Sequence, residues 1–279
     1  MTEAPALRLM AIVAHPDDES LGLGGMIAKY AAEGVEVSLV TATRGESGRY
    51  LGRRDGPEHP GPERLAAIRE GELRAAAAVL GIRDLSLLGF RDGHLDQADP
   101  REVVGRIVEH VRRMRPQVVV TFPPDGSYGH PDHIAICQLA TAAMVAAADP
   151  AYRAPAPPHA VAKLYYIVAT PPEWSAYQAA FKTLTSTVDG IERQAVPWPE
   201  WEITTEVDTR AHWPTVWKAV SCHASQVGGY ERLKDLSPEH HEALWGRRCL
   251  YRAYSTVNGG RHRERDVFEG LRSAPGADR

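Results

Sequence analysis

A histidine and three carboxylates stand within five consecutive residues near the start of the chain, at His15, Asp17, Asp18 and Glu19. Side chains of these types can hold a catalytic zinc ion, which needs three protein ligands and one open position for water. His15 and Asp18 can converge on one ion across the tight turn between them. Asp17 then stays uncommitted beside the metal, where it can take the proton from a bound water.

A second group of histidines and carboxylates follows another apolar run. His133 can supply the third metal ligand, while His130 and Asp132 would face the other side of a scissile bond. An imidazolium there would stabilise an oxyanion and protonate a leaving amine, and Asp132 would raise the pKa of His130. The alternative for the first group is structural, with Asp18 or Ser20 as a helix cap. Two such groups, each after a predicted strand, favour the metal site.

Apolar runs and helical segments alternate through the first 150 residues. Four apolar runs predict buried strands, at 8–14, 35–43, 85–88 and 118–122. The segments that follow them predict helices, at 20–33, 63–80, 100–114 and 131–148. This order indicates parallel βαβ units and predicts an α/β fold with a Rossmann-like, doubly wound, mostly parallel sheet. With strand order 3-2-1-4, the first and fourth strands end beside one crevice, where ligands bind in such sheets.

The composition changes near Asp149. The segment 150–159 contains four prolines, and all six tryptophans lie beyond it. We therefore predict a catalytic domain with the metal site over residues 1–150. Residues 151–279 are expected to form a smaller α+β C-terminal extension that completes the substrate pocket. The tryptophans could stack on a sugar face or belong to the core or a subunit interface.

The overall charge excludes some classes of partner. A net charge of −4 and a pI of about 6.3 give no reason to expect nucleic acid or an anionic membrane. Three scattered cysteines argue against a disulfide framework. We see no signal peptide and no apolar run of membrane-spanning length, so we expect a cytoplasmic protein with a small-molecule substrate. Whether the protein forms a homo-oligomer is left open.

Both motifs resemble those of the LmbE-like deacetylases, also called the PIG-L family. The sequence Ala-His-Pro-Asp-Asp-Glu stands at 14–19, and His-Pro-Asp-His stands at 130–133 after Tyr128 and Gly129. The resemblance covers about the first 150 residues. It implies a zinc-dependent hydrolase that removes an N-acetyl group from a glucosamine-containing small molecule or glycoside.

The resemblance also implies a role for individual motif residues. Zinc would be held by His15, Asp18 and His133. Asp17 would act as the general base. His130, oriented by Asp132, would be the cation that stabilises the transition state, and Tyr128 would contact the developing oxyanion. A site of two histidines and one carboxylate also suits Fe²⁺ or Mn²⁺.

Four further residues resemble the family's substrate-binding positions. Arg69 resembles an arginine that binds substrate hydroxyls or phosphate-like groups, and its alternative is a solvated helix face. Asp92 resembles a sugar-binding aspartate, and Glu46 lies in a loop that borders the pocket in the family. For both, a plain loop role is the alternative. His223, in a late His-Ala-Ser-Gln sequence, would reach the site or pack between helices.

Two other functions stay open at this point. An amidase of thiol-conjugated pseudodisaccharides shares the same motifs. A non-catalytic nucleotide- or sugar-binding module is the more distant alternative, suggested by the glycines at 22, 24 and 25. These glycines follow a polar stretch instead of forming the strand-to-helix turn. The second strand ends in Thr43 and Arg44, with no acidic residue for a ribose.

Overall fold

The computed structural model describes residues 6–180, 185–188, 190–227, 231–258, 260 and 262–272. Its centre is a seven-stranded sheet in the order β3-β2-β1-β4-β5-β9-β8. The strands are β1 (Arg8–Val13), β2 (Glu36–Thr43), β3 (Asp84–Phe90), β4 (Val118–Thr121), β5 (Lys163–Val168), β8 (Thr205–Asp208) and β9 (Arg247–Ser255). A separate hairpin consists of β6 (Thr185–Val188) and β7 (Ile191–Gln194).

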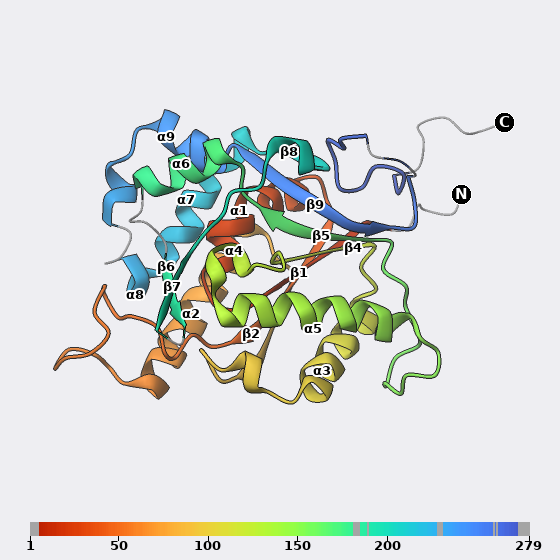
Figure 1. The fold of residues 1–279 in the computed structure, drawn as a ribbon, viewed down its shortest axis with the longest axis horizontal. Coiled ribbons are helices and arrows are strands. Elements are labelled where there is room, and N and C mark those ends of the chain that lie inside the picture. Colours follow the sequence, from red (N-terminus) through yellow and green to blue (C-terminus); the bar gives the residue numbers. More distant parts are fainter. Residues whose placement is uncertain are drawn as a thin grey trace.

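Helices cover both faces of this sheet (Figure 1). α3 and α5 pack together on one face, and α1, α2 and α7 pack together on the other. The helices are α1 (Asp18–Ala32), α2 (Pro62–Leu80), α3 (Pro100–Met114), α4 (Gly126–Gly129), α5 (Pro131–Ala148), α6 (Pro171–Ala180), α7 (Trp213–Cys222), α8 (Ala224–Val227) and α9 (Pro238–Trp245). Short 3₁₀ turns are η1 (Leu95–Gln97), η2 (Glu200–Glu202), η3 (Arg210–His212) and η4 (Glu231–Asp235). Within the described residues, no helix combines the length and apolarity that crossing a membrane requires.

The predicted α/β fold and the strand order 3-2-1-4 are confirmed. β1 lies between β2 and β4 and runs parallel to both, with Leu9 beside Val37 and Val118. β5 continues the parallel part, and β9 and then β8 add antiparallel strands. The sheet therefore continues past residue 150, and the division into two domains stays a prediction.

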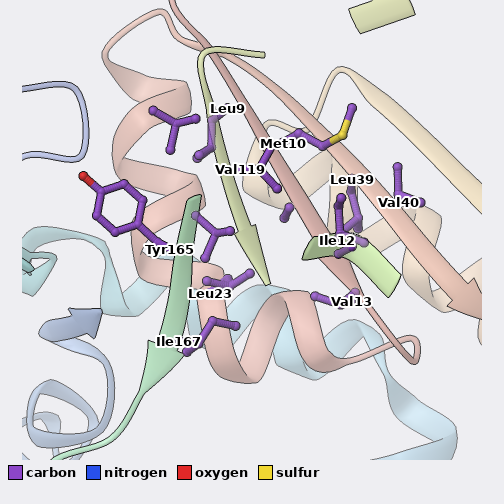
Figure 2. Close-up of a cluster of buried hydrophobic side chains, with 14 of the residues drawn as sticks. Leu9, Met10, Ile12, Val13, Leu23, Leu39, Val40, Val119, Tyr165 and Ile167 are labelled. Atoms are coloured by element: carbon purple, nitrogen blue, oxygen red, sulfur yellow. The ribbon is translucent and has the colours of Figure 1, made fainter. Parts of the chain in front are cut away.

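β1 is buried on both faces, because helices cover each side of it. Figure 2 shows Leu9 and Ile12 of this strand in one buried cluster with Leu39 of β2 and Val119 of β4. Each fully buried Leu or Ile contributes about 1.5–3 kcal/mol relative to an exposed one. The strand that carries the first motif at its end is thus anchored in the hydrophobic core.

Candidate active site

The turns after β1 and β4 meet at one edge of the sheet, since the two strands are adjacent and parallel. A cavity of about 1150 Å³ opens there. Most of the predicted site residues line it: His15, Asp17, Asp18, Arg69, Asp92, Tyr128, His130 and His133. Glu46, Asp132 and His223 lie outside its wall.

Donor atoms of three side chains face one another in this cavity. His15 Nδ1 lies 3.2 Å from His133 Nε2, and carboxylate oxygens of Asp18 lie 3.6 Å from each of these nitrogens. Tetrahedral bonds of about 2.0–2.1 Å separate neighbouring ligand atoms by about 3.4 Å, so the triangle has the size of a zinc site. Burial lowers the pKa of His133 to about 3, which keeps its imidazole in the neutral form that binds metals.

The other ring nitrogen of His15, Nε2, contacts two carboxylates. His15 Nε2 lies 3.0 Å from Asp92 Oδ1 and 3.0 Å from Asp132 Oδ2. Asp132 also accepts hydrogen bonds from the backbone N–H groups of Gly93, at 2.7 Å, and Leu95, at 3.0 Å. Burial alone would raise the pKa of Asp92, but His15 lowers it to about 2. Two ionised carboxylates therefore orient the ring so that Nδ1 points at the other donors.

Other combinations of these side chains are also close enough to hold an ion. His15 with Asp92 and Asp132 is one, and His15 with His130 and His133 is another. The first is less suited to catalysis, because Asp132 is fully buried and already accepts two backbone N–H groups. A catalytic ion needs an open position for water, and His15, Asp18 and His133 all line the cavity, whereas Asp132 does not.

Asp17 has an unusual backbone and an unusual carboxyl group. Its φ of 102° lies in the left-handed region, which costs a residue other than glycine about 1–3 kcal/mol. Burial raises the pKa of its carboxyl from 3.8 to about 6, against the lowering effect of Arg69. A carboxylate with a pKa near 6 is suited to accept a proton at neutral pH.

Arg69 joins two loops at the cavity. Its Nη2 lies 3.1 Å from Asp17 Oδ2 and also donates to the carbonyl of Pro16. Its Nη1 donates to the carbonyl of Gly45 at 2.9 Å. Gly45 has a φ of 68°, and a Cβ there would collide with this guanidinium, so both its backbone conformation and this close approach favour glycine. Arg69 is 4% exposed, which excludes the solvated helix face considered above.

His130 is placed by the start of α5, and its contacts and pKa refine the expectations for it. Its Nδ1 accepts the backbone N–H of Asp132 at 3.2 Å, as an N-cap, whereas the Asp132 carboxylate contacts His15. Asp132 therefore orients His130 through its backbone N–H, while its carboxylate orients His15. The pKa of His130 is lowered from 6.5, because burial and His15 outweigh Asp132. The lowered pKa favours the neutral imidazole of His130 over the expected imidazolium.

Tyr128 lies beside these histidines, with its ring 5.9 Å from that of His130 and 5.3 Å from that of His133. Burial and the nearby Asp18 raise its pKa well above 10, so its hydroxyl remains a hydrogen-bond donor. The hairpin β6–β7 packs on α4, and Ser186 Oγ donates to the carbonyl of Tyr128 at 3.1 Å.

The remaining predicted substrate contacts occupy different places. Asp92 lines the cavity, and Glu46 Oε1 accepts its backbone N–H at 2.8 Å, so Glu46 supports the loop. His223 is 1% exposed and its Nε2 lies 2.8 Å from Glu19 Oε1. Because His223 is buried and lies outside the cavity wall, this position does not support a contact between His223 and substrate.

Sequence reasoning considered a sugar-stacking role for the tryptophans as a group but did not single out α6. Trp174 and Tyr177 both line the cavity, with their rings stacked at 5.7 Å. Burial and the carboxylates of Asp17 and Asp18 raise the pKa of Tyr177. Neither residue belongs to a motif, and a tryptophan spaced three residues before a tyrosine is an ordinary helix pattern. Trp198 also lines the cavity.

Comparisons with known proteins agree with the motifs. Residues 10–144 match the family model described as PIG-L, GlcNAc-PI de-N-acetylase. The chain is 40% identical over 296 residues to a 1D-myo-inositol 2-acetamido-2-deoxy-alpha-D-glucopyranoside deacetylase of Rhodococcus jostii (strain RHA1), covering 95% of this chain and 98% of that protein. A protein with the same description from Streptomyces griseus is 36% identical, over 97% of this chain and 91% of its own length.

Solved structures share the fold. The conserved protein TT1542 from Thermus thermophilus has a TM-score of 0.65 and 25% identity, covering 91% of this chain and 97% of its own. The N,N'-diacetylchitobiose deacetylase from Pyrococcus horikoshii has a TM-score of 0.59 and 24% identity, covering 79% and 71%. The 4-carboxy-2-hydroxymuconate hydratase GalB from Pseudomonas putida KT2440 has a TM-score of 0.69 and 20% identity, covering 91% and 99%. Because a hydratase and a deacetylase both share it, this fold alone does not specify a reaction.

Proposed function

This chain belongs to the PIG-L family of de-N-acetylases, and from that premise we propose that it removes the N-acetyl group from a small glycoside of N-acetylglucosamine. The observation that carries the proposal is the triangle of His15, Asp18 and His133 donor atoms with the Asp17 carboxyl beside it. Curated relatives that match nearly the whole chain are deacetylases of a glucosaminyl inositol.

The metal belongs to this proposal as well. His15 Nδ1, His133 Nε2 and the Asp18 carboxylate would hold it, and their separations suit one small divalent cation. Zinc in this position supplies a Lewis acid and lowers the pKa of a water molecule toward 7. Fe²⁺ and Mn²⁺ fit the same nitrogen and oxygen donors, so the native metal is a matter for experiment.

Asp17 accepts the proton of the attacking water while the water oxygen bonds to the acetyl carbon. The amide C–N bond then breaks, and the nitrogen leaves as an amine after taking up a proton. Because the pKa of His130 is lowered, the proton held by Asp17 is the one best placed to pass to that nitrogen. His130 and the protonated hydroxyl of Tyr128 act as hydrogen-bond donors to the oxyanion.

The cavity suits a sugar with an attached group. Its wall combines ionised side chains near Asp92 with the aromatic faces of Trp174, Tyr177 and Trp198. Small-molecule sites commonly combine such apolar surface with a few polar groups that set orientation. An amidase of thiol-conjugated pseudodisaccharides would use the same groups at the amide, so these residues do not distinguish the two functions.

The test is release of acetate and of a primary amine from N-acetylglucosaminyl inositol. The protein would be stripped with a chelator and then reloaded separately with Zn²⁺, Fe²⁺ or Mn²⁺. A thiol-conjugated pseudodisaccharide serves as the competing substrate. Amine release that returns with metal supports the proposal, and faster release from the thiol conjugate would favour the amidase. No amine from either substrate with any of the three metals would contradict both.

A further inference from the structure

We propose that Glu19 and His223 form a buried positioning pair that holds the backbone of Asp17 in its left-handed conformation. The inference rests on the proposed function, because it presumes that Asp17 is the base. It assigns His223 a role through another residue, and it gives Glu19 a role of its own.

The contact that reaches Asp17 comes from Glu19. The backbone N–H of Asp17 donates to Glu19 Oε2 at 3.0 Å, while the carboxyl of Asp17 lies against Arg69. At a φ of 102° the residue is held in a conformation that its own side chain disfavours. Glu19 on one side and Arg69 on the other therefore fix the direction in which the base points.

Glu19 in turn depends on His223. The Glu19 side chain is fully buried, and its Oε1 accepts from Ser20 Oγ at 2.5 Å and from His223 Nε2 at 2.8 Å. A buried carboxylate without a cationic or hydrogen-bonding partner is strongly unfavourable. Within the described residues His223 Nδ1 has no hydrogen-bond partner, and His223 Nε2 lies 2.8 Å from Glu19 Oε1 and 3.5 Å from Ser20 Oγ, so the shorter contact with Glu19 is the main one that orients this ring.

The segment that carries His223 is itself firmly held. Ser225 donates to Glu72 of α2 through its N–H, at 2.6 Å, and through its hydroxyl, at 2.7 Å. Gln226 Nε2 donates to the carbonyl of Arg49 at 2.8 Å, in the loop that follows β2. His223 thus stands on an anchored base, which a positioning residue requires.

Replacing His223 should therefore slow the reaction without weakening substrate binding. His223→Leu removes the donor to Glu19, and a shift of about 1 Å in a reacting group can cost about 100-fold. We expect kcat to fall roughly 10- to 100-fold, with KM and bound metal unchanged. His223→Gln should restore most of kcat, because its amide nitrogen can take the place of Nε2.

Two further variants separate positioning from a general structural effect. His241 is 4% exposed and stacks between Trp213 and Trp245, away from Asp17. His241→Leu therefore removes another buried histidine and should leave kcat unchanged. His223→Asn is too short to reach Glu19 Oε1, so it should lose kcat where His223→Gln keeps it. This pair decides the question even if His223→Leu does not fold.

The experiment measures kcat, KM, metal content and the thermal unfolding midpoint on one acetylated substrate. A loss of kcat alone in His223→Leu and His223→Asn, with recovery in His223→Gln, supports the positioning pair. Unchanged kcat in both would overturn it, as would a raised KM at constant kcat or a parallel loss of metal. If the wild type is active and one of these contradicting results is found, only this inference is overturned and the proposed function stands. An inert metal-loaded wild type overturns the proposed function and this inference with it.

Discussion

Two groups of buried charge lie in different parts of the central sheet, and only the first lines the cavity. The first is the site after β1 and β4. The second surrounds Glu264, near the start of β5, where Lys163 Nζ and Arg252 Nη1 each lie 2.7 Å from Glu264 Oε1. Tyr165 and Thr205 donate to Glu264 Oε2 at 2.6 and 2.9 Å. We call this second group the sealed cluster.

The two groups differ in how their charges are balanced. In the sealed cluster, burial would raise the pKa of Glu264, but Lys163 and the hydroxyl donors lower it. At the site, burial outweighs Arg69 and the pKa of Asp17 rises to about 6. Buried charge alone therefore does not identify a site. A site is identified by donor atoms that face one another beside a cavity, together with a buried carboxyl whose negative charge is only partly compensated.

Loss of a metal ligand should have the largest effect at the site. His15→Ala, Asp18→Ala and His133→Ala should each lose bound metal and measurable deacetylation, because three ligands leave no redundancy. Elemental analysis and acetate release are the measurements. Glu264→Gln is the matched control and should keep its metal. Near-stoichiometric metal in His133→Ala would remove His133 from the ligand set.

Removal of the general base should have the next largest effect. Asp17→Asn is expected to keep its metal and to lose about 10²–10⁴ in kcat, the usual contribution of a positioned general base. Steady-state kinetics on metal-loaded protein are the measurement. A metal-free variant would make Asp17 a ligand, and a fully active one would assign proton transfer to another group.

A substitution in the sealed cluster should lower the free energy of unfolding instead of kcat. Glu264→Gln leaves Lys163 buried without a carboxylate, and breaking a buried pair in this way costs about 3–5 kcal/mol. The thermal midpoint should fall by about 10 °C, while kcat of the folded fraction stays that of the wild type. Loss of kcat at unchanged stability would show that the sealed cluster is coupled to the site.

Much of this arrangement is predictable from the sequence, for a geometric reason. Apolar runs indicated the parallel strands, and parallel strands bring the ends of β1 and β4 to one edge. The direction of the Asp132 side chain was not predictable, since it depends on N–H groups of Gly93 and Leu95 from another loop. The pairing of β9 with β5 and the contact of His223 with Glu19 join distant segments that no local pattern connects.

The smallest predicted effects are the pH slopes of stability, which should have opposite signs in the two groups. Asp17 has a pKa of about 6 in the folded protein and an ordinary value of 3.8, so the native state binds more protons between these values. The free energy of unfolding should therefore fall as pH rises through that window. Glu264 has a lowered pKa, so its stabilisation is complete above its ordinary value of 4.5 and is lost as pH falls.

Urea unfolding of the metal-free protein at pH 4, 5, 6 and 7 separates these contributions. Asp17→Asn should be more stable than the wild type at pH 7, and this gain should shrink toward pH 4 as the wild-type carboxyl becomes protonated. The deficit of Glu264→Gln should stay constant from pH 7 to 5 and begin to shrink at pH 4. If the stability gain of Asp17→Asn did not change with pH, the wild-type Asp17 carboxyl would be ionised at all four pH values. Arg69 would then balance it as Lys163 balances Glu264, and the electrostatic distinction between the two groups would be lost.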